Sequence, residues 1–206
     1  MTQVGQTAKR PYHHGDLRTA LLAAAEQELV ERGIEDFSLR SVAQRAGVSH
    51  TAPKHHFGSA DGLLTALSAI GFERFVQTQT AMKTRADSDP VSQLEAAGLG
   101  YVAFAEANPA MFRLMFASER PERTAPELAD ASKSAFDALV TDVANARRFK
   151  QLDPDGDETA VAAAWATAHG LADLLISERL NAIRALGKDD KAKVMARILS
   201  TSALSN

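Results

Sequence analysis

The 206-residue sequence contains no cysteine. This absence excludes disulfide scaffolds, thiolate metal sites and cysteine nucleophiles together, and it fits a reducing compartment. The sequence also lacks an apolar run near the length that spans a bilayer, and residues 1–10 start polar with no apolar stretch behind them. We therefore expect a cytoplasmic protein that does not insert into membranes.

Signals for β-strands are almost absent as well. There are no alternating β-branched runs and no Asn-Gly hairpin turns, and long alanine- and leucine-rich stretches place apolar residues three and four positions apart. This pattern predicts an all-α protein of about nine helices. We expect a small three-helix domain at residues 1–60 and a larger helical domain at residues 61–206.

The small excess of negative charge is unevenly distributed. The formal net charge is −3, but residues 1–60 carry seven Lys or Arg against six Asp or Glu, whereas residues 61–206 carry sixteen against twenty. Five of the six histidines also lie in the first segment. A field that attracts phosphate must therefore come from local clustering of side chains in this segment.

The first helix is expected to end at Gly33, because glycine is the preferred residue just after a helix C-terminus. The apolar stripe that should face the core comprises Leu17, Leu21, Leu22, Ala25, Leu29 and Val30. The charged residues expected largely outside this stripe are Glu26, Glu28, Glu31 and Arg32.

Three serines are placed to cap the next helices. Ser38 and Ser49 precede two short helices, which should end at Gly47 and near Phe57. Ser59 should cap a fourth, long helix that runs into the low eighties.

Ala43 and Gly47 have the four-residue spacing of a helix-turn-helix motif. In that motif a small residue sits where two helices touch, and a glycine adopts the left-handed conformation that begins the turn. On spacing alone, a helical hairpin with a solvated polar face is an equally good interpretation. The side chains that would reach phosphates and base edges are Ser38, Arg40, Arg45, Ser49, His50, Thr51, Lys54, His55 and His56.

The stretch Phe37–Phe57, FSLRSVAQRAGVSHTAPKHHF, resembles the second and third helices of the TetR family of bacterial transcriptional regulators. Gly58–Leu63 resembles the start of that family's fourth helix. Asn108–Phe116, together with Trp165 and His169-Gly170, resembles the subgroup whose C-terminal domain is named for a Trp, a His and a Gly. The resemblance implies a homodimeric DNA-binding repressor that a small molecule releases from a near-palindromic operator, and no cofactor is expected.

Two positions depart from the family pattern. Lys54 stands where the family usually has a tyrosine that contacts backbone phosphate, and Ala60 stands where it usually has a lysine. We expect Lys54 to supply the positive charge that Ala60 lacks, but from another place. Pro53 lies inside the predicted recognition helix, and with Ser49 as the cap it would lose only the first hydrogen bond of that helix.

Aromatic and methionine side chains concentrate in the middle of the chain. A plain hydrophobic core would use the same residues at the same spacing as a binding cavity. The resemblance implies an effector pocket among the middle helices, whose mostly apolar ligand tilts the fourth helix and so changes the separation of two recognition helices. The candidate lining residues are Phe72, Phe75, Tyr101, Phe104, Met111, Phe112, Met115, Phe116, Trp165 and His169.

The last two predicted helices, from Thr159 to about Ala185 and from Lys191 to Leu204, carry apolar stripes with many small residues. Such stripes either pack as a four-helix bundle across a two-fold axis or close a core within one chain. A symmetric dimer would space its recognition helices by one turn of DNA, roughly 34–36 Å, or moderately more. The candidate interface residues are Trp165, Ala168, Leu171, Leu175, Val194 and Ile198.

Other classes of function have weaker support. The pairs His13-His14 and His55-His56 point about 100° apart on a helix and have no carboxylate at ligand spacing, so no metal site is expected. His169 and Asp173 share a helix face and suit an acid/base pair, but Ser177 lies roughly 12 Å along the axis from that histidine, so we expect no enzyme. A dimeric helical adaptor that binds protein instead of DNA is the other alternative, and only the departures from the family pattern support it.

Overall fold

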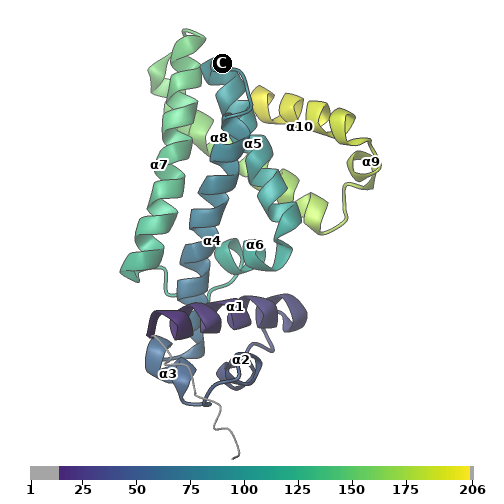
Figure 1. The fold of residues 1–206 in the computed structure, drawn as a ribbon. Helices are drawn as coiled ribbons and strands as arrows, with labels where there is room; N and C mark the ends of the chain where they lie inside the picture. Colours follow the sequence, from purple (N-terminus) through teal and green to yellow (C-terminus); the bar gives the residue numbers. More distant parts are fainter. Residues whose placement is uncertain (1–13, 205–206) are drawn as a thin grey trace, which may run out of the picture. The chain divides into compact units, whose positions relative to one another are not determined.

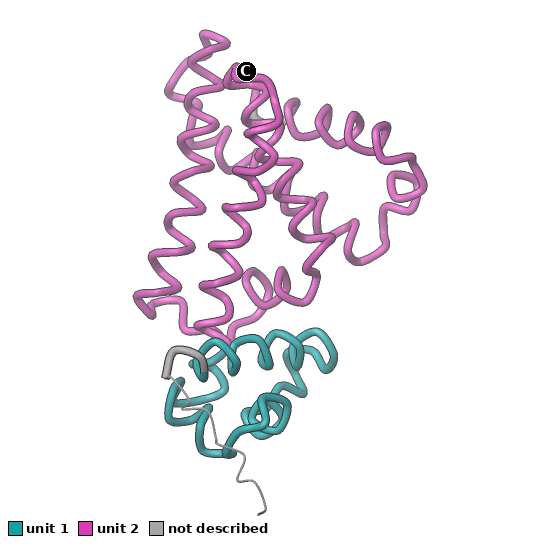
Figure 2. Tube along the Cα trace, viewed as in Figure 1, with its two compact units in different colours: residues 1–63 teal, residues 64–206 magenta. Residues whose placement is uncertain are grey.

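The computed structural model describes residues 14–204, so the predictions for His13 and for residues 1–10 lie outside it. Within this range the chain forms ten α-helices, one 3-10 helix and no strand, which confirms the all-α class with slightly more helices than expected (Figure 1). The chain divides into two compact units, residues 1–63 and 64–206 (Figure 2). The boundary falls inside α4 (Ala60–Lys83), close to the predicted position after residue 60.

The first unit contains α1 (His14–Arg32), α2 (Leu39–Arg45) and α3 (Ala52–Phe57). Helix α1 packs on α2, and α2 packs on α3. Because α2 and α3 are short, the core needs the apolar faces of all three helices. The buried residues of this core include Leu21, Ala25, Leu29, Phe37, Val42, Ala43 and Leu63.

The predicted apolar stripe of α1 is wrong at two positions. Val30 is 68% exposed, whereas Glu28 is only 1% exposed. A helix turns by about 100° per residue, so Glu28, seven residues after the buried Leu21, returns to the same face. Val30 lies nine residues after Leu21 and therefore points to the opposite side. Helical phase, and not hydrophobicity, decides which of these two residues is buried.

Most of the predicted helix caps are confirmed. Ser38 has extended backbone angles of −139° and 143°, and its Oγ accepts a hydrogen bond from Ser41 N at 3.2 Å. Gly33 and Gly47 have φ angles of 76° and 66°, in the left-handed region that glycine tolerates. Ser59 Oγ accepts from the backbone of α4 at 2.9 Å.

The predicted cap at Ser49 is wrong. Helix α3 begins at Ala52 with Thr51 at the cap position, and Ser49 Oγ lies 2.9 Å from Thr51 Oγ1 in the preceding turn. Pro53 is therefore the second residue of α3, where a backbone nitrogen has no helical acceptor. The proline loses no hydrogen bond, and its ring is buried in the core.

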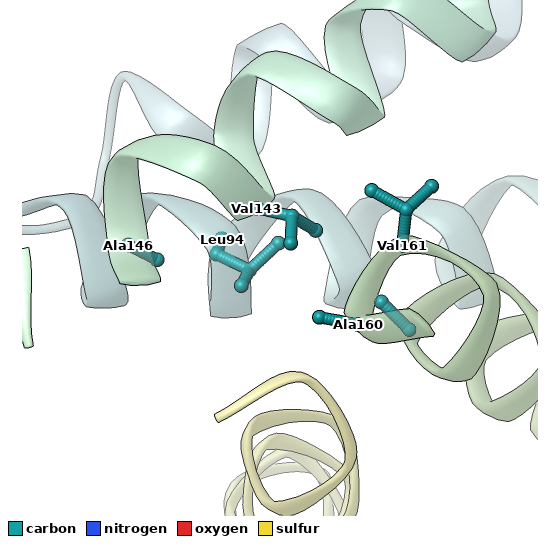
Figure 3. Close-up of a cluster of buried hydrophobic side chains, with 6 residues drawn as sticks. Leu94, Val143, Ala146, Ala160 and Val161 are labelled. Carbon is teal, nitrogen blue, oxygen red and sulfur yellow. The ribbon is translucent and has the colours of Figure 1, made fainter. Parts of the chain in front are cut away.

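The second unit contains the rest of α4 and the remaining helices, with α5 at its centre. Helix α5 packs against α6, α7, α8 and α10, and α7 also packs against α8. One buried cluster joins α5, α7 and α8 through Leu94, Val143, Ala146, Ala160, Val161 and Ala164 (Figure 3). The helix bounds are α5 (Pro90–Ala107), α6 (Pro109–Phe116), α7 (Pro126–Phe149), α8 (Asp157–Ile176), α9 (Asn181–Arg184) and α10 (Lys188–Ala203), with the 3-10 helix η1 (Pro154–Gly156) before α8.

Two glycines allow α4 to run close to its neighbours. A Cβ at Gly100 on α5 would lie 2.7 Å from the Cα of Gln79 on α4. A Cβ at Gly71 on α4 would lie 2.7 Å from Met115 Sδ on α6. A backbone atom cannot move aside as a flexible side chain can, so the crossing of α4 and α5 requires glycine at position 100.

The predicted helix from Thr159 to about Ala185 is too long. Helix α8 ends at Ile176, and α9 follows as a separate helix. Glu178 adopts a left-handed φ of 61°, and Arg179 N donates to Leu174 O at 2.9 Å, which closes the helix end. Because a glutamate takes the position that glycine usually occupies, the composition gave no stop signal.

One helical segment is long and apolar enough to cross a membrane, although the sequence analysis predicted no such segment. An 18-residue window within Pro154–Ile176 has a mean hydropathy of 1.3. This is weak evidence for a span, because the core helix of a globular unit meets the same criterion. Helix α8, which makes up this segment, packs against α5, α7 and α10.

Candidate DNA-binding surface and effector cavity

The exposed face of α3 carries side chains predicted to contact DNA. Thr51, Lys54 and His55 are exposed at positions i, i+3 and i+4, while Pro53 on the other face is buried. His50, which precedes the helix, is also exposed. Among residues 14–204, the ammonium of Lys54 has no hydrogen-bond or ion-pair partner. The donors on this face are available to phosphates and base edges.

Two further predicted contact residues differ in their exposure. Arg40 on α2 is exposed, and its guanidinium has no partner in the part of the chain that the structure describes. His56 is half-buried, with its ring centroid 5.5 Å from that of His55 and 6.3 Å from that of Phe57. Arg40 is therefore available for a contact with phosphate, whereas His56 also packs against its neighbours on α3.

Ser38 and Ser49 are engaged in local hydrogen bonds. Ser38 Oγ lies 2.8 Å from Ser41 Oγ while it caps α2. Ser49 Oγ lies 2.9 Å from Thr51 Oγ1 in the turn before α3. Ser38 thus caps α2, whereas Ser49 is bonded within the turn that precedes α3.

Arg45 is turned toward α1. Its Nη1 donates to Glu31 Oε1 at 3.0 Å, and its Nη2 donates to Glu28 Oε2 at 3.2 Å and also pairs with Glu31. Arg32 Nε lies 3.4 Å from the second oxygen of the buried Glu28. The hydrogen bond between Glu31 and Arg45 lowers the pKa of Glu31 and raises the pKa of Arg45. Arg45 therefore belongs to an ion-pair cluster between α1 and α2.

A cavity of about 530 Å³ lies among the helices of the second unit. This volume is within the usual range of small-molecule sites, about 300–1,000 Å³. Helices α4, α5, α6, α7, α8 and α10 contribute to its wall. The aromatic part of the wall consists of Phe72, Phe75, Tyr101, Phe116, Phe136 and Trp165.

Half of the predicted pocket residues line this cavity. The five that do are Phe72, Phe75, Tyr101, Phe116 and Trp165. The other five lie outside the lining. His169 is half-buried, and four residues are buried in the core: Phe104 on α5, and Met111, Phe112 and Met115 on α6.

His169 lies behind the cavity wall. Its Nδ1 is 2.8 Å from the phenolic oxygen of Tyr101, and its ring stacks on Phe112 with centroids 5.2 Å apart. Burial raises the pKa of Tyr101. Burial also lowers the pKa of His169, and the charge of Asp173 only partly opposes this effect. Both side chains are therefore held in their neutral forms, and the hydroxyl of Tyr101 is already bonded.

Several polar residues that the sequence did not indicate also line the cavity: Gln79, Glu95, Arg123, Ser132, Lys133, Asp142 and Ser200. Asp142 accepts from Lys83 Nζ at 2.5 and 2.8 Å, and Arg123 donates to two backbone carbonyls. Within residues 14–204, by contrast, the amide of Gln79 and the carboxylate of Glu95 have no partner. No local pattern marks these residues, because their position on the wall depends on how the helices cross.

The predicted dimer residues fall into two groups. Three of them close the core of their own unit and are almost fully buried: Ala168, Leu171 and Leu175. The other three are exposed and available to a partner: Trp165, Val194 and Ile198. The exposed face of α8 also includes Ala162, Ala166, Asp173 and Leu174, which the sequence analysis did not select.

The alternative of an acid/base enzyme gains no geometric support. His169 Nδ1 is bonded to Tyr101, and Ser177 Oγ is buried with no hydrogen-bond partner in the described range. Residues 14–204 also contain no group of three or more His, Asp or Glu side chains placed to hold a metal ion.

Two family models match the chain. Residues 21–67 match the model for bacterial regulatory proteins of the tetR family. Residues 94–200, just over half of the chain, match the model for the tetracyclin repressor-like C-terminal domain. The first match covers α2, α3 and the start of α4, and the second lies entirely within the second unit. The finer resemblance to the Trp/His-Gly subgroup stays a prediction.

The chain is also similar to individual proteins. The HTH-type transcriptional regulator BetI of Stenotrophomonas maltophilia is 26% identical over 137 residues, which cover 66% of this chain and 69% of that protein. The BetI regulator of Burkholderia cenocepacia is 35% identical over 79 residues, 38% of this chain and 41% of that protein, so the match spans less than half of this relative. A solved structure of a Rhodococcus protein with unknown function is 31% identical, with a TM-score of 0.79 over 94% of this chain and 98% of the other.

Proposed function

Because the chain belongs to the TetR family of bacterial transcriptional regulators, we propose that it is a homodimeric repressor that a small molecule releases from a near-palindromic operator. The observation that carries the proposal is the exposed polar face of α3, with Thr51, Lys54 and His55 directed away from the core. We also propose a cytoplasmic location, since a repressor of this kind acts on the chromosome.

The contact with DNA would combine positioning and base recognition. Arg40 and Lys54 are exposed cations without partners among residues 14–204, which suits contacts to backbone phosphates. His50, Thr51 and His55 offer donors and acceptors for base edges in the major groove. This division supports α3 as the recognition helix, with α2 beside it.

The effector would bind in the 530 Å³ cavity. The aromatic wall favours a ligand with a flat apolar body. The side chains of Gln79 and Glu95, which have no partner within residues 14–204, favour a ligand that also donates hydrogen bonds. Helix α4 is continuous, its first residues belong to the first unit, and Phe72, Phe75 and Gln79 on it line the cavity. A ligand that contacts these three residues would bear directly on the helix that leads to the DNA-binding unit.

The dimer would form through the exposed faces of α8 and α10. Trp165 and Leu174 on α8, with Val194 and Ile198 on α10, are exposed apolar side chains. Their neighbours on α8 are mostly small, which permits close packing of helices from two copies. An isologous interface of this kind would place two recognition helices on one side of the DNA.

Selection from a random double-stranded DNA library, at near-physiological salt, tests the proposal. The purified full chain should enrich a near-palindromic motif with two half-sites about one helical turn apart. Recovery of no motif by a folded, dimeric protein would contradict operator binding and would favour the helical adaptor.

A further inference from the structure

Arg45 is the last residue of α2, and its guanidinium faces α1. Two carboxylates of α1 accept its hydrogen bonds: Glu31 Oε1 from Nη1 at 3.0 Å, and Glu28 Oε2 from Nη2 at 3.2 Å. Its Nε is buried and has no hydrogen-bond partner in the described range. The side chain is thus directed into its own unit, and its positive charge is compensated there.

The carboxylate of Glu28 depends on its contact with Arg45. This carboxylate is almost fully buried, and a buried charge needs a charged partner to replace the water it has lost. The planar fork of an arginine can serve two carboxylates at once, which a lysine cannot do as well. Arg32 approaches the other oxygen of Glu28 at 3.4 Å, but its side chain is more than half exposed. Arg45, whose side chain is 25% exposed, is therefore the better-buried of the two cationic partners of Glu28.

The turn that leads to the recognition helix starts directly after Arg45. Ala46 is the cap of α2, Gly47 has a φ of 66°, and Val48 N donates to Ala43 O at 3.0 Å. Helix α3 begins only seven residues after Arg45 and has six residues, so its own hydrogen bonds cannot set its direction. Holding the end of α2 against α1 fixes the geometry from which α3 departs.

The other end of α3 is also held by α1. Arg18 Cζ lies 5.3 Å from the ring centroid of Phe57, the last residue of α3, in a cation–π contact. The recognition helix is thus attached to α1 near both ends, by Arg45 through the turn and by Arg18 directly.

We propose that Arg45 and Glu28 are positioning residues for DNA binding: the ion pair between the half-buried Arg45 and the buried Glu28 fixes the recognition helix, and Arg45 does not itself contact DNA. This inference rests on the proposed operator binding and replaces the sequence-based assignment of Arg45 as a DNA contact. The proposal predicts whether DNA affinity rises or falls when the charge of Glu28 is removed. Removing the negative charge of Glu28 from a DNA-binding unit should strengthen binding by simple electrostatics, but it should weaken binding if the pair positions α3.

The test uses the full chain and the DNA motif that the library selection enriches. Glu28→Gln and Arg45→Met are each expected to weaken binding by about tenfold, equivalent to about 1.4 kcal/mol, without changing the slope of affinity against salt. The double variant should lose little more than either single one, since both remove the same interaction. Arg40→Met is the control, because an exposed phosphate contact should lower the salt slope by about one. Active fractions are titrated so that each affinity refers to folded protein.

Hydrogen exchange at the amides of residues 55–58 provides a readout that needs no DNA. Both Glu28→Gln and Arg45→Met should raise exchange there by about tenfold relative to the amides of α5. A lower salt slope for Arg45→Met, or equal or tighter binding by Glu28→Gln, would overturn the proposal, as would unchanged exchange in α3. If the parent chain enriches no DNA motif, operator binding fails separately, and the exchange measurement still decides whether the ion pair holds α3.

Discussion

The phenolic oxygen of Tyr101 and Nδ1 of His169 lie 2.8 Å apart, and their hydrogen bond joins α5 to α8. The ring of Tyr101 forms part of the cavity wall. His169 lies on the same helix as the exposed Trp165, one turn away. A ligand that displaces Tyr101 must therefore also disturb a residue beside the proposed dimer face.

Acidification is expected to destabilise the second unit through His169. Burial lowers the pKa of its imidazole below the ordinary value of 6.5, so the unfolded chain takes up this proton at a higher pH than the folded chain. The stability that the neutral ring contributes is complete above pH 6.5 and is lost as the pH falls below it. Thermal unfolding followed by circular dichroism from about pH 8 to about pH 5 should show this loss.

His169→Gln should flatten that pH profile, because glutamine does not titrate in this range. His50→Gln is the matched control, since His50 is an exposed histidine of the first unit. A His169→Gln protein whose melting temperature falls as steeply with acidification as that of the parent would assign the effect to other groups.

Gly100→Ala is expected to destabilise the chain by about 1–3 kcal/mol. The new Cβ would lie 2.7 Å from the Cα of Gln79, so α4 and α5 would have to separate. Gly170→Ala is the matched change on α8, where a Cβ meets nothing within 4 Å and helix propensity improves by about 1 kcal/mol. Urea unfolding should place the two variants on opposite sides of the parent, and equal stability of Gly100→Ala and the parent would contradict the tight crossing.

Local features of this fold were predictable from the sequence. A serine cap such as Ser38, and a left-handed glycine such as Gly47, act through bonds within four residues, so their sequence context contains the needed information. Glu178 shows the limit of this logic. It takes the left-handed position without being a glycine, and the end of α8 was missed for that reason.

The candidate sites were less predictable, because they depend on contacts between helices. Phe112 and Phe116 lie four residues apart on α6, but only Phe116 lines the cavity, while Phe112 packs on His169. Arg45 was predicted to contact DNA because it lies in the helix-turn-helix segment and carries donors that suit phosphate. In the structure its guanidinium bonds Glu31 and Glu28, fourteen and seventeen residues away on another helix, and no local pattern shows that pairing.

Lys54→Ala is expected to weaken operator binding by about 1–3 kcal/mol and to lower the salt slope by about one. Lys54 is exposed on α3 and has no partner among residues 14–204, so its charge is free for phosphate. Ala60→Lys should strengthen binding, since it adds a cation at the first residue of α4, in the DNA-binding unit. Fluorescence anisotropy over a range of salt concentrations measures both quantities, and an unchanged affinity and slope for Lys54→Ala would remove it from the DNA surface.

Asp173 on α8 and Arg197 on α10 are expected to pair across the proposed two-fold axis. Both side chains are exposed, and neither has an ion-pair partner in the part of the chain that the structure describes. In an isologous interface each such contact occurs twice, so Asp173→Arg or Arg197→Asp alone would create two like-charge contacts. Each single variant should weaken the dimer by about 1 kcal/mol or more, and the double exchange should restore it. Sedimentation velocity over a dilution series measures this, with Asp130→Arg on α7 as the control. If the dimer of the double variant dissociates as readily as the dimers of the single variants, Asp173 and Arg197 do not pair across the interface.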